Sequence, residues 1–475
     1  MFDETCTVNT EKADFIREAE IVALLREGEV ATPEEVRAVI ERSGRARGLS
    51  LREVAMLLGV EDETLIQEMF AVARQIKDQI YGKRVVLFAP LYISNYCVNN
   101  CGYCGYRAGN RFARRKLTQR ELADEVAILE NMGHKRIALE AGEHPDECPL
   151  EYVLEAIQTV YAVRNNQGSI RRINVNIAAT GEEEYARLKA SGIGTYILFQ
   201  ETYHRGMYAK MHPSGPKADY DWHTTAHDRA MRAGLDDVGI GVLFGLYDYA
   251  FETLALFQHA RHLESEFGVG PHTVSVPRLK PASGINPEQF PHRVSDREFM
   301  KVVAIIRLAL PYTGMILSTR ENVSLRTRLL DVGISQISAG SCTGVGGYKK
   351  EAMNEQRDGE VPQFNVEDRR SPDEVLADVC RYGYLPSFCT ACYRTGRTGE
   401  RFMALAKAGE IQNVCQPNAI LTFREYLLDY GTPETRLIGE QTLREHLARI
   451  PNVHIRRLTE ERLGQIERGE RDLSF

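Results

Sequence analysis

Between Val85 and Ser338 the sequence alternates short apolar runs with longer stretches in which apolar residues recur at helical spacing. Strand–helix units repeated in this way predict a parallel sheet, and eight of them allow closure into a (β/α)8 barrel of the TIM type. An open doubly wound sheet is the alternative, because periodicity does not prove closure. In a barrel, the loops that follow the strands carry the chemistry. The predicted strands are Val85–Ala89, Arg136–Leu139, Ile173–Ile177, Thr195–Phe199, Val238–Leu243, Thr273–Val276, Met315–Ser318 and Ile334–Ser338.

Further helical segments are expected before and after the barrel in the sequence. Residues 1–84 contain two capping-box patterns, Thr32–Glu35 and Ser50–Glu53, which predict an N-terminal helical extension. Residues 85–350 form the predicted barrel. Residues 351–475 begin with a polar linker and continue as short helical stretches, which predict a separate, mostly helical C-terminal module.

Charge and composition exclude several classes of protein. The net charge of -7 and the pI near 6.0 give no basic surface for nucleic acid. No apolar run approaches the roughly 18–20 residues that cross a bilayer, and the first residues do not have the pattern of a secretory signal. We therefore expect a cytoplasmic protein with no nucleic-acid or membrane partner.

The cysteines predict metal binding. Six of the 10 lie in two tight groups, which in a chain without a secretory signal favours metal ligation over disulfides. The remaining four lack ligand spacing and are interpreted as inert thiols. They are Cys6, Cys148, Cys342 and Cys380.

The first group has the spacing C-x3-C-x2-C and follows the first predicted strand. It consists of Cys97, Cys101 and Cys104. Three thiolates leave one iron of a four-iron cluster open for an outside ligand. A zinc knuckle is the alternative, but it needs a fourth Cys or His nearby, and none follows in this loop.

This spacing, with the aromatic Tyr103 before the last cysteine, resembles the motif of the radical S-adenosylmethionine (SAM) superfamily. The resemblance implies a 4Fe-4S cluster whose open iron is chelated by the methionine end of SAM. Reductive cleavage of the sulfonium then gives a 5′-deoxyadenosyl radical. It also assigns Tyr103 to the cofactor site.

Several strand ends match the SAM contacts of this superfamily. Glu140–Glu143 resembles the Gly-Gly-Glu segment that holds the methionine amino group, so Gly142 and Glu143 are assigned to SAM, with Ala141 as a departure from the motif. Alternating Asn and Gly also occur in plain strands, which is the alternative for most of the other assignments. Those are Asn174 and Asn176 at the ribose, Gly239 and Gly241 close to adenine, and Glu201.

Longer segments resemble the tyrosine lyases of the superfamily. The family has two branches, which cleave the Cα–Cβ bond of tyrosine and release p-cresol. One is the thiazole-pathway enzyme that makes dehydroglycine. The other is the maturase of FeFe-hydrogenase, which converts dehydroglycine to carbon monoxide and cyanide on a second cluster. The segments are 200–204, 211–217, 338–341 and 346–348.

The second cysteine group separates the two branches. Cys389, Cys392 and Cys415 have the spacing C-x2-C-x22-C, in the predicted C-terminal module. The thiazole enzyme is expected to lack this module, so the maturase branch is favoured, with an auxiliary iron–sulfur cluster. On spacing alone, the alternative is a structural zinc site completed by Cys380.

Two single residues complete the expected sites. The maturase resemblance implies a labile extra iron beside the auxiliary cluster, held partly by His272, which precedes the predicted strand Thr273–Val276 and so lies at the bottom of the barrel. The alternative is a histidine bonded to backbone. Arg320, after the seventh strand, is assigned to the tyrosine carboxylate through its planar fork. The alternative for Arg320 is an ion pair with a neighbouring Glu.

Three functions follow from these assignments. The favoured one is the maturase-type tyrosine lyase, supplied by an electron donor such as flavodoxin or ferredoxin and working with other hydrogenase maturation proteins. The second is the thiazole-pathway tyrosine lyase. The third, of another class, is an iron–sulfur carrier or electron-transfer protein, which would not need a whole barrel with strand-end charges.

Overall fold

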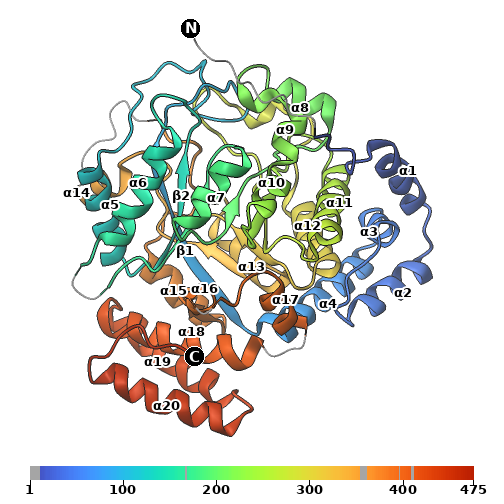
Figure 1. The fold of residues 1–475 in the computed structure, drawn as a ribbon. Helices are drawn as coiled ribbons and strands as arrows, with labels where there is room; N and C mark the ends of the chain where they lie inside the picture. The colour runs from blue at the N-terminus through green and yellow to red at the C-terminus, as the bar shows by residue number, and fades with distance from the viewer. Residues whose placement is uncertain (1–10, 166–167, 354–360, 395, 408–410) are drawn as a thin grey trace.

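The computed structural model describes residues 11–165, 168–353, 361–394, 396–407 and 411–475, so Cys6 lies outside the described residues. The chain opens with α1 (Glu18–Glu29), α2 (Pro33–Ser43), α3 (Leu51–Leu58) and α4 (Glu63–Tyr81). Both predicted capping boxes are confirmed, at Thr32 with Glu35 and at Ser50 with Glu53. These helices pack against one side of the barrel, on α11 (Tyr249–Phe267) and α12 (Asp296–Ala309) (Figure 1).

Eight parallel strands form a closed barrel. Each strand pairs with the next along the chain, and the eighth pairs with the first, which confirms the barrel and excludes the open sheet. All eight predicted runs contain a strand, although the fourth strand is only two residues long. The strands are β1 (Arg84–Ser94), β2 (Arg136–Ala141), β3 (Arg172–Asn176), β4 (Tyr196–Ile197), β5 (Val238–Gly241), β6 (Thr273–Ser275), β7 (Gly314–Leu317) and β8 (Gln336–Ser338).

Helices cover the outside of the barrel. A single hydrophobic cluster runs from Ile16 through the barrel to Ile450, so the three predicted segments share one core. The last helix of the barrel region, α14, crosses the predicted boundary at 350/351. The covering elements, besides α11 and α12, are α5 (Gln119–Asn131), α6 (Leu150–Ala162), α7 (Glu182–Ala190), α8 (Arg205–Met211), α9 (Tyr220–Thr224), α10 (Ala226–Arg232), α13 (Val323–Val332) and α14 (Gly347–Met353), with 3-10 turns at Pro216–Ala218 and Pro287–Gln289.

The C-terminal helices lie below the barrel, at the amino ends of its strands (Figure 1). They are attached by a ninth strand, β9 (Leu385–Ser387), which pairs in parallel with the first residues of β1. The sequence analysis did not predict this strand. The region also contains α15 (Pro372–Arg381), α16 (Ala391–Arg394), α17 (Gly399–Lys407), α18 (Ile411–Asp429), α19 (Pro433–Ala448) and α20 (Val453–Glu467). Among the described residues, no helix is both long and apolar enough to cross a membrane.

Candidate active site

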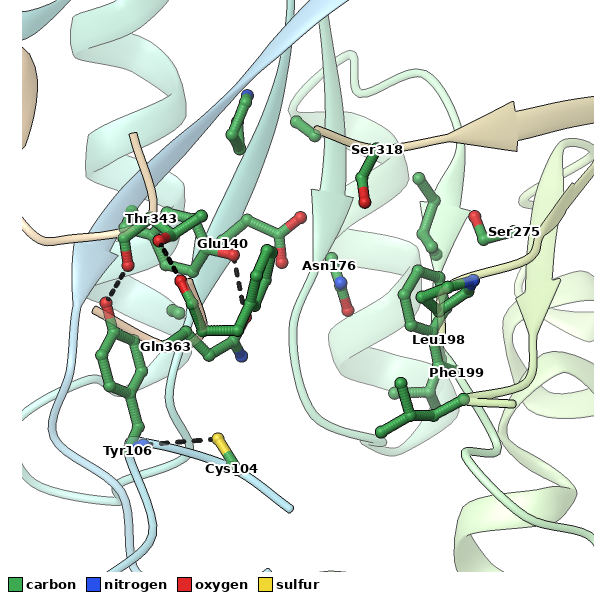
Figure 2. A pocket seen from close by; sticks show the side chains of 18 of the residues that line it. Cys104, Tyr106, Glu140, Asn176, Leu198, Phe199, Ser275, Ser318, Thr343 and Gln363 are labelled. Atoms are coloured by element: carbon green, nitrogen blue, oxygen red, sulfur yellow. Dashed lines mark hydrogen bonds between the residues drawn. The ribbon is translucent and has the colours of Figure 1, made fainter. Parts of the chain in front are cut away.

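A cavity of about 210 Å³ opens at the carboxyl ends of the barrel strands (Figure 2). The strand register puts Tyr92 of β1, Glu140 of β2 and Asn176 of β3 at one level, and all three side chains line the cavity. The loop that follows β1 adds the three thiols of the first cysteine group. The barrel therefore gathers acidic, amide and thiol groups at the end where barrel enzymes carry their chemistry.

The cysteine loop is held in shape by one half-buried guanidinium. Arg114 donates to the carbonyl oxygens of Asn95, Tyr106 and Arg107 at 2.7, 2.6 and 2.7 Å. The guanidinium also lies over the aromatic ring of Phe112, with 4.0 Å between its carbon atom and the ring centroid. Because carbonyl oxygens on both sides of the cysteines bind one side chain, the loop is fixed without regular secondary structure.

The loop also rests directly on the end of β2. The Val98 N–H donates to the Glu143 carbonyl at 2.8 Å. A Cβ at position 142 would lie 2.3 Å from the carbonyl oxygen of Tyr96 and 3.1 Å from Cβ of Cys97. Gly142 is therefore required for the close approach of the two segments, and it also lines the cavity.

Burial strongly affects the thiols of this loop. Together with the neighbouring cysteines, it raises the pKa of Cys101 to about 11 and that of Cys104 to about 12. The Tyr106 N–H donates to Sγ of Cys104 at 3.4 Å (Figure 2). Three thiols facing one cavity, with Cys101 buried and Cys97 and Cys104 half-buried, fit a positively charged iron–sulfur core, which takes the place of the thiol protons.

Two polar pairs stand beside the thiols. Asn99 Nδ2 donates to the Glu143 carboxylate at 2.5 Å, which orients that side chain toward the cavity. Lys217 donates from Nζ to Glu201 at 3.2 Å, and both line the cavity. Burial lowers the pKa of Lys217, but Glu201, Cys101 and Cys104 together outweigh burial and the pKa is raised overall. Glu201 has a left-handed backbone, with φ 69°.

The other predicted cofactor contacts differ in position. Tyr103 lines the cavity, with its hydroxyl 2.9 Å from Nε2 of His212. Asn174 also lines it, and its side-chain oxygen accepts from the Thr195 N–H at 3.1 Å. Gly239 and Gly241 are not among the residues that line the cavity.

The two β5 glycines have a packing role that the sequence analysis did not anticipate. A Cβ at 241 would lie 2.7 Å from the ring of Phe199, and one at 239 would lie 2.6 Å from Oγ1 of Thr273. Side chains of the neighbouring strands fill the space that a side chain on β5 would need. The absence of a side chain therefore serves contacts between strands at these positions.

Arg320 faces the cavity from the loop after β7. Its guanidinium carbon lies 3.4 Å from the ring centroid of Phe364, and burial lowers its pKa. The neighbouring Glu321 pairs instead with Arg278 and with Lys280, the latter at 3.2 Å. Within the described residues no carboxylate lies at ion-pair distance from Arg320, so the alternative of a structural pair with Glu321 is wrong.

A second cavity, of about 80 Å³, lies at the other end of the barrel. Cys389, Cys392 and Cys415 line it together with His272. A hydrogen bond with the Cys392 thiol and the nearby Arg84 lower the pKa of Cys415, whereas the pKa of Cys392 is raised. The structure thus brings together the three distant cysteines and the histidine that the sequence analysis grouped.

Cationic groups surround these cysteines. Arg84 and Arg136 enter the second cavity from β1 and β2, and Arg397 enters from the C-terminal region. Each has a buried guanidinium nitrogen without a hydrogen-bond partner within the described part of the chain. Buried donors of this kind call for an acceptor, and an anionic thiolate-bound cluster supplies one.

His272 immediately precedes β6. Its Nε2 lies 3.5 Å from the Tyr393 hydroxyl, and its Nδ1 lies 3.6 Å from Oδ1 of Asp237. Its ring nitrogens thus face side chains, which differs from the backbone-bonded alternative. Burial lowers the pKa of His272, and the neutral ring that results is the form that binds a metal.

The zinc alternatives find no support in the geometry. Cys380 is buried in α15, where its thiol is hydrogen-bonded to Thr442, and it does not line the second cavity. In the described ranges, no three Cys, His, Asp or Glu side chains converge as the ligands of one metal ion. Ligands of a polynuclear cluster bind different iron atoms and stand farther apart.

Comparisons with known proteins agree with this geometry. The family model "Radical SAM superfamily" matches residues 91–257, and "Biotin and Thiamin Synthesis associated domain" matches residues 275–385. A crystal structure of HydG, a maturase of the [FeFe]-hydrogenase, superposes with a TM-score of 0.95 at 58% identity, over 98% of this chain and 100% of that one. The chain belongs to the HydG family of radical SAM enzymes.

Two further relatives support the HydG family. HydG from Carboxydothermus hydrogenoformans has 41% identity and a TM-score of 0.80, over 94% of this chain and 99% of that one. The 2-iminoacetate synthase of Escherichia coli (strain K12) is 31% identical, over 77% of this chain and 93% of that protein. The HydG matches extend over nearly the whole chain. The family implies a radical SAM 4Fe-4S cluster, SAM and a tyrosine substrate.

Sequence reasoning missed several charged residues of this HydG-family site. Glu140 directly follows the apolar run Ile137–Leu139 within β2, which was the available signal, because a charge in a buried strand is rare without a function or a partner. The others gave no signal, since a single Lys or Arg in a sequence usually marks the surface. They are Lys217 at the first cavity and Arg84, Arg136 and Arg397 at the second.

Proposed function

We propose that this chain cleaves the Cα–Cβ bond of L-tyrosine to p-cresol and dehydroglycine, and converts dehydroglycine to carbon monoxide and cyanide for the active site of FeFe-hydrogenase. The observation that carries the proposal is the pair of cysteine-lined cavities at opposite ends of one barrel. A 4Fe-4S cluster with SAM, when bound, supplies the adenosyl radical that removes a hydrogen atom from the substrate.

The residues of the first cavity have distinct roles in this proposal. Cys97, Cys101 and Cys104 hold the cluster, and Glu143, oriented by Asn99, binds the methionine amino group. Tyr103, Gly142, Asn174, Asn176 and Glu201 complete the cofactor contacts, whereas Gly239 and Gly241 shape the barrel wall. Arg320 binds the tyrosine carboxylate by two parallel N–H donors. At the mouth of the barrel, the bound cofactor and substrate would displace water from around the reacting carbon.

The second cavity distinguishes the maturase from the thiazole-pathway lyase. Cys389, Cys392 and Cys415 hold an auxiliary iron–sulfur cluster, and His272 binds a labile extra iron next to it. The guanidinium groups around them balance the charge of the cluster. An electron donor such as flavodoxin or ferredoxin and other hydrogenase maturation proteins complete the proposed set of partners.

One assay separates the three functions considered. Reduced protein is incubated with tyrosine and SAM, and p-cresol and carbon monoxide are measured. The maturase forms both, the thiazole-pathway enzyme forms p-cresol alone, and an iron–sulfur carrier forms neither. Changing Cys97, Cys101 or Cys104 to Ala should abolish 5′-deoxyadenosine formation, because no cluster remains to reduce the sulfonium. 5′-Deoxyadenosine at unmodified levels in any of these variants would contradict the assignment.

A further inference from the structure

Glu140 is the carboxylate of the first cavity that the proposed cofactor contacts do not use. Glu140 precedes Gly142 by two residues. It is paired with Tyr92 on one neighbouring strand and with Asn176 on the other, and all three side chains line the cavity. Figure 2 shows Glu140 and Asn176 at the same cavity, and the Asn176 amide favours the charged form of the Glu140 carboxylate. Nothing in the cofactor assignment explains a carboxylate at this level.

The charges around Glu140 leave it without an ion-pair partner in the described chain. The groups that act on it are Arg320 from the loop after β7 and Glu201 from the loop after β4, with the Asn176 amide of β3 and the Tyr92 hydroxyl of β1 beside it. Arg320 favours the charged carboxylate and Glu201 opposes it. Burial is the largest effect and raises the pKa of Glu140 to about 8.

Arg320 is charged, and Glu140 becomes charged above about pH 8 or when a cation lies beside it, so the two residues then present opposite charges to one small space. An α-amino acid carries an ammonium and a carboxylate on the same carbon atom, so it matches such a pair. Each buried charge is costly while it has no partner, and a zwitterion removes both costs at once. A substrate without the amino group would satisfy only Arg320.

We propose that Glu140 binds the ammonium group of the amino-acid substrate while Arg320 binds its carboxylate. This assignment rests on the proposed tyrosine lyase function and adds a residue to it. The contact also provides a path for one proton: an N–H proton of the ammonium passes to the carboxylate, which leaves a neutral amine and a carboxylic acid. Because burial raises the pKa of Glu140 toward that of an amine, the carboxylate is basic enough to share this proton.

The test compares two ligands that differ only in the amino group. The dissociation constants of L-tyrosine and of 3-(4-hydroxyphenyl)propanoate are measured on the cluster-loaded enzyme with SAM, for the unmodified chain and for Glu140→Gln. We expect the substitution to weaken tyrosine binding by about tenfold or more and to leave the propanoate within about twofold. An equal effect on both ligands, or none on either, would overturn the assignment.

Two control variants show whether the effect of Glu140→Gln is specific to the amino group of the substrate. Arg320→Lys should weaken both ligands, because both carry the carboxylate. Glu143→Gln should weaken SAM, whereas Glu140→Gln should bind SAM normally and retain its iron. Loss of SAM binding in Glu140→Gln would assign Glu140 to the cofactor instead and would also overturn the proposal.

The unmodified enzyme provides a test that needs no variant. Its preference for tyrosine over the propanoate should decrease as the pH falls below about 8, because Glu140 takes up a proton. A preference that stays constant across this range would contradict the proposal. If the unmodified enzyme forms no p-cresol from tyrosine, the proposed function fails. If it forms p-cresol but the ligand comparison shows no difference, only the role of Glu140 fails.

Discussion

The buried ionisable side chains in and around this barrel include two groups. In the first group, each charge has a protein partner: Arg326 pairs with Asp368, and Arg278 donates to Glu321 at 2.9 Å. In the second group are Glu140 and Arg320, which face the first cavity. Because a buried charge without a partner costs several kcal/mol, we expect ligands to match the second group. The presence or absence of a protein ion-pair partner therefore distinguishes structural charged residues from ligand-binding ones better than the degree of burial does.

The first prediction at this scale concerns Arg320. Arg320→Lys keeps the positive charge but loses the planar pair of donors that fits a carboxylate. We expect tyrosine affinity to fall by about tenfold, with a smaller change in 5′-deoxyadenosine formation at saturating tyrosine. Isothermal titration and a product assay measure the two quantities. An unchanged tyrosine affinity would make Arg320 a structural residue.

Glu252, in α11, supports the strained turn that carries Glu201. Its carboxylate accepts from the Thr202 hydroxyl and, at 2.8 Å, from the Tyr203 N–H. Burial raises its pKa from 4.5 to about 8. Since the folded state then binds the proton more tightly than the unfolded chain, Glu252 adds stability below about pH 4.5, and this contribution is lost as the pH rises through about 8.

The second prediction tests the direction of this pH dependence of stability with Glu252→Gln, because glutamine cannot titrate. Relative to the unmodified chain, the variant should gain about 3 kcal/mol of stability between about pH 5 and about pH 8. The measurement is the difference in melting temperature of the two cluster-free proteins at each pH. A difference that is the same at both ends of the range would show that burial does not raise the pKa of Glu252.

At the scale of elements, the sequence predicted those strands whose pattern of apolar residues is visible within a few consecutive positions. Each barrel strand was located because its apolar run is a local pattern. Strand β9 was missed, because Leu385–Ser387 is short and contains Pro386, and its pairing with Arg84–Val86 depends on contacts made after folding. The role of Glu140 was missed for the same reason, since the register that turns its side chain inward is a tertiary property.

The third prediction concerns the contact between the cysteine loop and β2. A Cβ at position 142 would lie 2.3 Å from the Tyr96 carbonyl oxygen, so Gly142→Ala must push the loop away from the strand. We expect lower iron content after reconstitution and weaker SAM binding, without loss of the fold by circular dichroism.

Gly464→Ala is the matched control for that prediction. Gly464 lies inside α20, and a Cβ there meets only the end of a flexible Arg468 side chain, at 3.5 Å. This change should stabilise the protein by up to about 1 kcal/mol and leave iron content unchanged. Normal iron loading and SAM affinity in Gly142→Ala would mean that the loop tolerates the displacement.

At the scale of the whole molecule, one strand connects the two sites. Arg84 and Val86, at the start of β1, line the second cavity, whereas Phe88, Pro90 and Tyr92, farther along, line the first. The two cavities therefore receive their cysteines from different segments and lie at opposite ends of the same barrel. A change confined to the second group of cysteines should leave the first site assembled.

The fourth prediction uses this separation. Replacing Cys389 and Cys415 by Ala removes two of the three ligands proposed for the auxiliary cluster, while the loop after β1 keeps its own. Tyrosine cleavage should persist, so p-cresol should still form, at a rate reduced only by the disturbance of the C-terminal helices. Carbon monoxide should fall sharply and hydrogenase activation should be lost. Gas analysis and p-cresol chromatography on the same sample measure the ratio of the two products.

Two further variants help to interpret a loss of carbon monoxide without a loss of p-cresol. Cys380→Ala also removes a buried thiol from the C-terminal helices, but this thiol does not line the second cavity, so the ratio of carbon monoxide to p-cresol should stay unchanged. His272→Ala should lower the ratio more mildly than the double change, because one ligand of the labile iron is lost while the cluster stays. An unchanged ratio in the double variant, with zinc in the C-terminal site, would make this cysteine group structural. A loss of p-cresol equal to the loss of carbon monoxide, with the first cluster intact, would mean that the two ends of the barrel act as a single site.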